Sequence, residues 1–352
     1  MSRWFAGDAG FVCKKRPPWF LLLAGIVCPL VKKNGLTQIH PHHPMNIARR
    51  HFLTATAASA FASVSTGHSA RAAANPPGTP DIAKELANPG YTLRNRGIKH
   101  TLMGWCWKPM ETLTLARHAK EIGLVGIEGI ERKFYPDVKA LGLEVSLVGS
   151  HGFSTGPCNP KFREEVIAKL NEAIDVAADV GCRKVITFTG MRFDGMDPEK
   201  AVADCLSVWK TVLPHAEKKG VTLVLEHLNS RDSSHPMKGH PGYFGDDVDF
   251  CVELIKKVGS PNFKLLFDIY HVSIMNGDII RRLRQHREFV GHIHTAGNPG
   301  RCELDQHQEI NYPAVMRALL EIGYHDFVAH EFIPTWSDTI LALRHAAMVC
   351  DV

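Results

Sequence analysis

The chain has 352 residues, with 41 Lys and Arg against 36 Asp and Glu, and a formal net charge of +5 at pH 7. Residues 1–74 hold nine of the basic residues and one acidic residue, Asp8, so the remainder carries 32 basic and 35 acidic residues, a net charge of −3. A nucleic-acid-binding protein needs a concentrated basic surface to replace phosphate counterions. The charge of the remainder therefore excludes nucleic acid as an expected partner.

Residues 1–74 have the composition of a targeting region. From Met45 the chain carries the pair Arg49 and Arg50, then a weakly apolar Ala-rich stretch, then small residues at 70–74. This pattern resembles a twin-arginine export signal with its cleavage region. We therefore expect the twin-arginine machinery to export the protein to the periplasm, with residues 75–97 as a linker.

Two alternatives remain open for this region. The apolar run from Pro17 to Val31 is shorter than the roughly 20 residues of a membrane-spanning helix. Translation from Met45 would remove it, whereas translation from Met1 would make it a second signal or a membrane anchor. The Ala-rich stretch could instead form a helix that packs on the following domain. This alternative is disfavoured, because the stretch lacks a repeating apolar stripe.

Eight short apolar runs follow, and helical patterns separate them. The runs cover 98–104, 124–129, 143–149, 184–190, 221–226, 263–268, 289–294 and 327–331. The clearest helical patterns lie at 161–181, 198–220 and 312–323, and several end at a glycine, which tolerates the left-handed conformation that closes a helix. This alternation predicts a single-domain α/β fold over 98–352, the (β/α)8 TIM barrel. An open doubly wound sheet is less favoured, because no GxGxxG follows the first strand.

Four residues with metal-binding side chains end the last four runs: Glu226, Asp268, His294 and Glu331. The carboxyl ends of barrel strands share one rim, so these side chains should converge there. Any one of these residues alone could be an ordinary solvent-exposed polar residue at the rim. Four in consecutive units favour a metal site, because a buried carboxylate is costly unless paired or metal-bound. Three carboxylates and one imidazole suit a divalent metal such as Mg²⁺, Mn²⁺ or Co²⁺.

The chemistry of such a site depends on its two glutamates. A divalent cation can hold a hydroxyl and the adjacent carbonyl of a substrate and stabilise an enediolate. Glu226 and Glu331, on the fifth and eighth strands, could remove a proton and return it at the neighbouring carbon. This predicts an isomerase of the aldose-ketose type.

Longer motifs surround these residues: LEHLN at Glu226, FDIYH at Asp268, HIHTAGNPGR at His294, EINYP, and AHEF at Glu331. From about residue 98 to the C-terminus the chain resembles the hydroxypyruvate isomerase family of xylose isomerase-like TIM barrels. The resemblance implies that the four residues bind the metal and that both glutamates also transfer protons.

The same resemblance implies that His271 contacts a substrate oxygen and that Arg301 holds a substrate carboxylate or hydroxyls. A structural histidine at a helix N-terminus is the alternative for His271, and a surface salt bridge for Arg301. At the position of His294, many hydroxypyruvate isomerases have Gln, whereas epimerase relatives have His. A sugar is therefore an alternative substrate.

Neighbouring polar residues are weaker candidates. Successive strand residues point to opposite faces, so His227 should pack beneath a helix. His292 is in phase with His294 and should point inward one layer deeper without binding the metal. The others follow strand ends: His151, Asn229 and Arg231.

Several functions share this predicted site. A ketose 3-epimerase or an inosose dehydratase-like enzyme would use the same residues on a sugar. A nuclease of the same barrel type is disfavoured by the net charge of −3 outside residues 1–74. An exported sugar-binding protein without catalysis is disfavoured because both glutamates are present. The expected partner is a small hydroxy-keto acid or sugar, and a homo-oligomer is possible.

Overall fold

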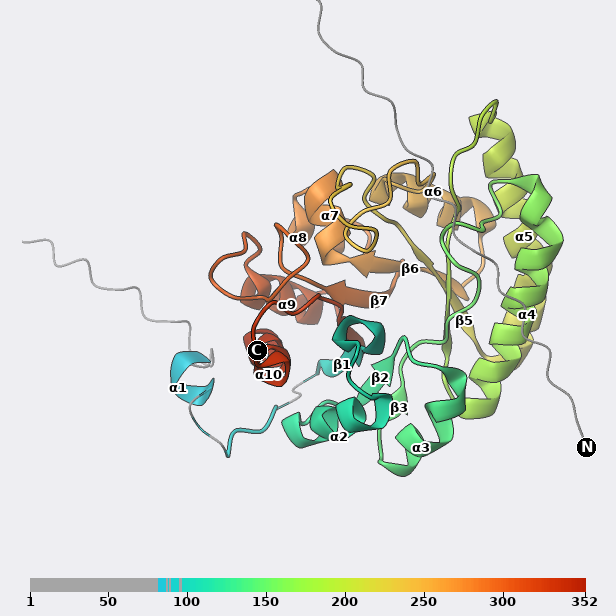
Figure 1. Ribbon diagram of the computed structural model, residues 1–352. Helices are drawn as coiled ribbons and strands as arrows, with labels where there is room; N and C mark the ends of the chain where they lie inside the picture. The colour runs from blue at the N-terminus through green and yellow to red at the C-terminus, as the bar shows by residue number, and fades with distance from the viewer. Residues whose placement is uncertain (1–81, 87, 89, 95–96) are drawn as a thin grey trace, which may run out of the picture. The chain divides into compact units, whose positions relative to one another are not determined.

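The computed structural model describes residues 82–86, 88, 90–94 and 97–352, and the predicted signal lies outside them. Its centre is one eight-stranded parallel sheet of order β3-β2-β1-β8-β7-β6-β5-β4 (Figure 1). The strands are β1 (Lys99–Met103), β2 (Gly126–Glu128), β3 (Glu144–Val145), β4 (Lys184–Thr187), β5 (Thr222–Glu226), β6 (Phe263–Asp268), β7 (Val290–Thr295) and β8 (Phe327–His330). Each predicted apolar run coincides with one strand, except that β7 extends one residue beyond its run, to Thr295.

The sheet closes into a barrel between its two outer strands. Beyond the end of β3, Val148 forms a parallel bridge with Val185 of β4. The amide of Val148 donates to the carbonyl of Lys184 at 3.0 Å, and the amide of Ile186 donates to the carbonyl of Val148 at 3.1 Å. The predicted TIM barrel is therefore confirmed for the described part of the chain.

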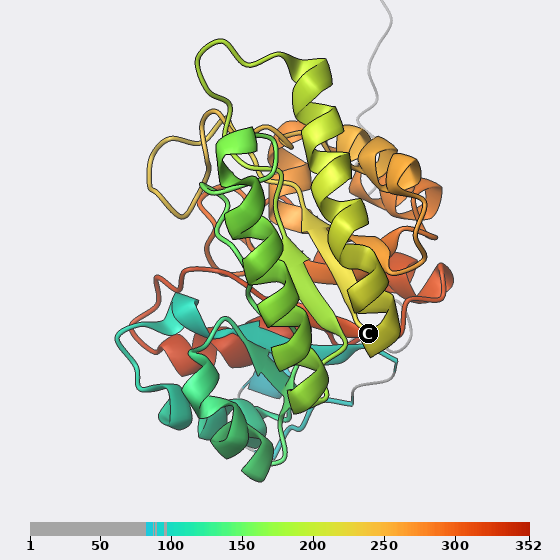
Figure 2. The same cartoon turned by 90° about the vertical axis from the view of Figure 1, so that its right-hand side faces the viewer.

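Helices surround this barrel. They are α1 (Ile82–Leu86), α2 (Thr112–Ile122), α3 (Tyr135–Ala140), α4 (Arg163–Val180), α5 (Pro198–Lys219), α6 (Val248–Val258), α7 (Ile269–Met275), α8 (Ile279–Gln285), α9 (Tyr312–Glu321) and α10 (Thr339–Cys350). Figure 2 shows α4 and α5 side by side over β4 and β5. The predicted ends of these two helices are confirmed, because Gly181 and Gly220 adopt left-handed φ angles of 76° and 66°.

Apolar packing between sheet and helices forms most of the core. Trp209 of α5 and Phe263 of β6 are fully buried, with ring centroids 4.9 Å apart. Three short 3-10 helices, η1 (Gly104–Trp107), η2 (Arg132–Phe134) and η3 (Pro160–Phe162), lie in the connections. Among the described residues, every helix is too short or too polar to cross a membrane.

Candidate active site

The four predicted metal ligands meet at the carboxyl rim of the barrel. Glu226 and Asp268 are the last residues of β5 and β6, His294 is next to last in β7, and Glu331 follows β8. Strand register aligns them, since Asp268 pairs with His294 and the amide of Glu331 donates to the carbonyl of Thr295 at 2.9 Å. One potential ligand atom from each of the four lies within 4.8 Å of the others, and all four residues are buried.

Three of these atoms are poorly satisfied by the protein itself. Oε1 of Glu226, Nδ1 of His294 and Oε2 of Glu331 are buried without a hydrogen-bond partner in the described part of the chain. Nδ1 of His294 is 2.7 Å from Oε2 of Glu331, but the contact lacks hydrogen-bonding geometry. Oε2 of Glu331 also forms an ion pair with Nη2 of Arg301 at 2.8 Å, whereas an unpaired buried atom such as Oε1 of Glu226 costs about 1–3 kcal/mol. A divalent cation would satisfy all three, so the residues fit a metal with a preference for oxygen ligands.

The three carboxylates differ in their electrostatic environment. Burial, reinforced by the charge of Glu331, raises the pKa of Glu226 to about 7. Burial also raises the pKa of Asp268 to about 6, against the effect of Arg301. Burial alone would raise the pKa of Glu331 too, but Arg301 and His294 lower it to about 2. Glu331 is therefore the carboxylate that stays ionised most readily.

Asp268 has two structural roles. Its Oδ1 accepts hydrogen bonds from the amides of Tyr270 at 2.8 Å and His271 at 3.2 Å, and so caps the N-terminus of α7. Its Oδ2 lies 3.5 Å from Nη2 of Arg301 and 3.6 Å from Nε2 of His271. The cap fixes the carboxylate so that one oxygen stays directed at the site.

His271 lies beside Asp268 in the first turn of α7 and is fully buried. Its Nδ1 accepts hydrogen bonds from the backbone amide of Asn229 at 3.1 Å and from its side-chain amide at 2.7 Å. Because Nδ1 is an acceptor, the neutral ring carries its proton on Nε2, which has no hydrogen-bond partner within the described ranges. His271 therefore makes the backbone hydrogen bond expected of a structural histidine. The same bond leaves Nε2 free to donate to a substrate oxygen.

Arg301 is not a surface residue, so the alternative of a surface salt bridge is wrong. It is 2% exposed, and its guanidinium lies 5.5 Å from the ring centroids of both Trp105 and Tyr270. Nη2 is 2.8 Å from Oε2 of Glu331, and Nη1 donates to the carbonyl of Met237. These contacts hold one planar cation at the wall of the site.

A cavity of about 270 Å³ opens onto Glu226, Arg301 and Glu331. Its size is near the lower limit of small-molecule pockets. The loops after β3 and β5 meet at this cavity, where the rings of Phe153 and His240 lie 4.1 Å apart. The cavity therefore suits a compact polar metabolite.

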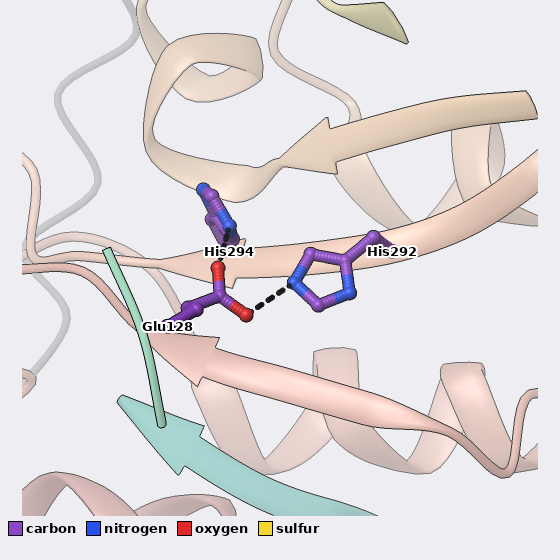
Figure 3. A group of neighbouring side chains, drawn as sticks. All are labelled: Glu128, His292 and His294. Carbon is purple, nitrogen blue, oxygen red and sulfur yellow. Dashed lines mark hydrogen bonds and ion pairs between the residues drawn. The ribbon is translucent and has the colours of Figure 1, made fainter. Parts of the chain in front are cut away.

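One residue of the site was not predicted. Glu128, at the end of β2, is fully buried between the rings of His292 and His294 (Figure 3). Its Oε1 accepts from Nε2 of His294 at 2.8 Å, and its Oε2 accepts from Nε2 of His292 at 3.0 Å. The sequence feature that could have indicated this residue is its acidic side chain inside the apolar run 124–129. The inward direction predicted for His292 is confirmed.

The weaker candidates have different positions. His227 is buried with its ring 6.1 Å from Phe267 and 6.3 Å from His271, outside the four-residue cluster. His151 lines the cavity and contacts the hydroxyl of Thr187 at 2.9 Å. Arg231 donates to the carbonyl of Ile274, away from the site. Among the weaker candidates Asn229 matters most, because it holds His271.

Residues 117–346 match the family model described as xylose isomerase-like TIM barrel. A putative hydroxypyruvate isomerase from Homo sapiens is 31% identical over 178 residues, which cover 49% of this chain and 62% of the relative. A 2-oxo-tetronate isomerase from Cupriavidus necator is 30% identical over 165 residues, covering 47% of this chain and 60% of the relative. The match thus spans about three-fifths of each relative's length.

Solved structures share the fold at lower identity. An AP endonuclease, family 2, from Brucella melitensis is 24% identical with a TM-score of 0.61, covering 68% of this chain and 93% of that chain. An L-ribulose 3-epimerase is 19% identical with a TM-score of 0.59, covering 70% of this chain and 91% of that one. At these identities the similarity concerns the fold alone.

Proposed function

Because the chain belongs to the xylose isomerase-like TIM barrel family, we propose that it is a divalent-metal-dependent isomerase acting on a small hydroxy-aldehyde and hydroxy-ketone pair through an enediolate. The substrate we favour is hydroxypyruvate or a similar short keto acid. The observation that carries the proposal is the convergence of Glu226, Asp268, His294 and Glu331, with unsatisfied buried atoms on three of them. The names of the isomerase relatives support the same reaction class.

The four residues would hold Mg²⁺, Mn²⁺ or Co²⁺. Once bound, the cation would polarise the substrate carbonyl and make the proton on the adjacent carbon easier to remove. Glu331 and Glu226 would move that proton between the two carbons. Nε2 of His271 would donate to a substrate oxygen, and the guanidinium of Arg301 would orient a carboxylate or hydroxyl at the wall of the cavity.

A ketose 3-epimerase is the second candidate. The same two glutamates could remove and return a proton at a single carbon, and His294 is the residue expected of the epimerases. The shared fold with L-ribulose 3-epimerase is compatible with this function. A dehydratase acting on an inosose-like ketone and a sugar-binding protein without catalysis remain further alternatives.

Proton exchange in D₂O, followed by NMR, separates these functions. Metal-loaded protein is incubated with hydroxypyruvate and with a panel of ketoses. Deuterium uptake accompanied by conversion to the aldehyde supports the isomerase, whereas uptake at C3 of a ketose with inversion supports the epimerase. Absence of metal-dependent exchange with every compound would contradict both.

We also propose that residues 45–74 direct export through the twin-arginine machinery to the periplasm. The paired Arg49 and Arg50 support this. Expression of the full chain and of a variant with both arginines replaced by lysine, followed by cell fractionation, tests the proposal. Equal distribution of the two proteins between the fractions would argue against export by this route, and membrane retention of both would favour an anchor.

A further inference from the structure

Glu128 is buried below the rim and faces His294, a candidate metal ligand. Glu128 comes from β2 and His294 from β7, and both residues are 0% exposed. Three side-chain donors bind the carboxylate: Nε2 of His294 at 2.8 Å, Nε2 of His292 at 3.0 Å and the hydroxyl of Ser146 at 2.5 Å. We propose that Glu128 is a positioning residue that fixes the ring of His294 so that Nδ1 faces the metal. This inference rests on the proposed function.

The hydrogen bond determines which nitrogen of His294 is available. An ionised carboxylate can only accept, so Nε2 of His294 carries the proton in this contact. The lone pair of a neutral ring is then on Nδ1, which lies 2.7 Å from Oε2 of Glu331 and 3.4 Å from Oε1 of Glu226. A lone pair facing carboxylate oxygens is unfavourable unless Nδ1 binds a proton or a metal cation, and a metal leaves the ring neutral. The direction of the bond therefore suits metal binding through Nδ1.

Other polar contacts hold Glu128 from below. His292 donates to it through Nε2, and Nδ1 of His292 is 3.4 Å from Nζ of Lys184. That ammonium pairs at 2.8 Å with Oδ2 of Asp326, at the amino end of the barrel. Since an ammonium can only donate, Nδ1 of His292 must accept and Nε2 must donate. These contacts link the two ends of the barrel and fix the donors that face Glu128.

A second metal bound by Glu128, His292 and His294 is the competing interpretation, because their ligand atoms also lie close together. Such an ion would displace the two ring donors from the carboxylate and would lie near the Lys184 ammonium. It would also require His294 to bridge two cations through both nitrogens. The complete set of hydrogen bonds around Glu128 favours the positioning role.

Co²⁺ binding to the purified protein tests this role without any substrate. Wild type and Glu128→Gln are titrated with Co²⁺ while the visible absorption of the ion is recorded. A glutamine amide offers one acceptor and one donor group, so it cannot accept from both rings. Loss of a bond that orients a metal-bound histidine typically weakens binding 10–100-fold. We expect that weakening, together with a changed Co²⁺ spectrum, because the nitrogen ligand is no longer held.

Matched variants separate positioning from general destabilisation. Asp249→Asn breaks another carboxylate-histidine contact, the 2.7 Å pair between Asp249 of α6 and His286, which follows α8, and should leave Co²⁺ affinity unchanged. If Glu128→Gln fails to fold, Glu128→Asp replaces it. The shorter side chain cannot reach both rings, so weaker binding is again expected.

The outcomes also distinguish this inference from the proposed function. Wild-type affinity and spectrum in a folded Glu128 variant would overturn the positioning role and leave the isomerase proposal intact. Two bound Co²⁺ ions in wild type and one in Glu128→Gln would overturn it in favour of a second metal. Absence of Co²⁺ binding by wild type would overturn both proposals. Weakened Co²⁺ binding without proton exchange in wild type would support the positioning role and contradict the isomerase.

Discussion

Nη2 of Arg301 lies 2.8 Å from Oε2 of Glu331, and both residues are almost fully buried. This cation lowers the pKa of Glu331, whereas burial raises the pKa of Glu226 to about 7. Two carboxylates with such different environments are suited to different steps, one as a proton acceptor and the other as a donor. An unequal pair suits the proton transfer that both the proposed isomerase and the epimerase alternative require.

Replacement of either glutamate should stop catalysis and leave the barrel folded. Glu226→Gln and Glu331→Gln each remove a proton-transfer group, which typically contributes about 10²–10⁴-fold to the rate. We expect at least a 100-fold loss of turnover in the D₂O exchange assay, with a normal circular dichroism spectrum. Glu321→Gln, which changes an exposed pair with Arg284, is the control and should retain activity. Full activity in either site variant would contradict the mechanism.

Metal removal should lower stability as well as activity. Three buried carboxylates close together repel one another, and a cation that binds only the folded protein stabilises it by about 2.7 kcal/mol at 100 times its dissociation constant. We expect a chelator to lower the melting temperature and abolish proton exchange, and added Mn²⁺ to restore both. Identical melting curves with chelator and with Mn²⁺ would argue against this site.

The strand ends could be predicted from sequence, because their apolar runs and polar last residues are local patterns. Glu226 and Asp268 were recognised in this way, and the parallel fold brings them together. The contact between Glu128 and His294 could not be predicted in this way, because the two residues are 166 positions apart. Hydrophobic periodicity does not show which inward-facing side chains touch. The contact of Phe153 with His240 was equally hidden, since it depends on two irregular loops.

Arg301→Lys should discriminate between substrate classes. Lysine keeps the charge but loses the planar fork that binds a carboxylate through two parallel bonds. We expect KM for hydroxypyruvate to rise about tenfold or more and KM for an uncharged ketose to change less. Arg282→Lys, at a partly exposed pair with Asp249, is the control for arginine replacement. Equal increases in KM for both substrates would show that Arg301 does not specifically bind the substrate carboxylate.

The loop after β3 depends on a close backbone approach at Gly156. A Cβ at this position would lie 2.2 Å from Cα of Gly190, and neither backbone can give way easily. Gly156→Ala should therefore lower the free energy of unfolding by about 1–3 kcal/mol. On the same loop, Gly152→Ala meets nothing closer than the Ser154 hydroxyl at 3.9 Å and serves as the control. Chemical denaturation of both variants measures the difference, and equal stability would contradict the close approach.

Asp326 should give the barrel a pH-dependent contribution to stability. Its Oδ2 lies 2.8 Å from Nζ of Lys184, whose side chain is 9% exposed. Burial would raise the pKa of Asp326, but Lys184 holds it below 3.8. Because the folded pKa is lower than the unfolded pKa, the stabilisation is present above pH 3.8 and is lost as the pH falls through the folded value.

Asp326→Asn removes this contribution. The side chain of Asp326 is 41% exposed, and water screens the pair, so we expect a loss of about 1 kcal/mol at pH 7. The difference in unfolding free energy between wild type and variant should shrink as the pH is lowered toward 3, because the protonated aspartate resembles the asparagine. Urea denaturation of both proteins from pH 3 to 7 measures this difference. A difference that stays constant over the whole range would assign it to lost hydrogen bonding rather than to the charge of Asp326.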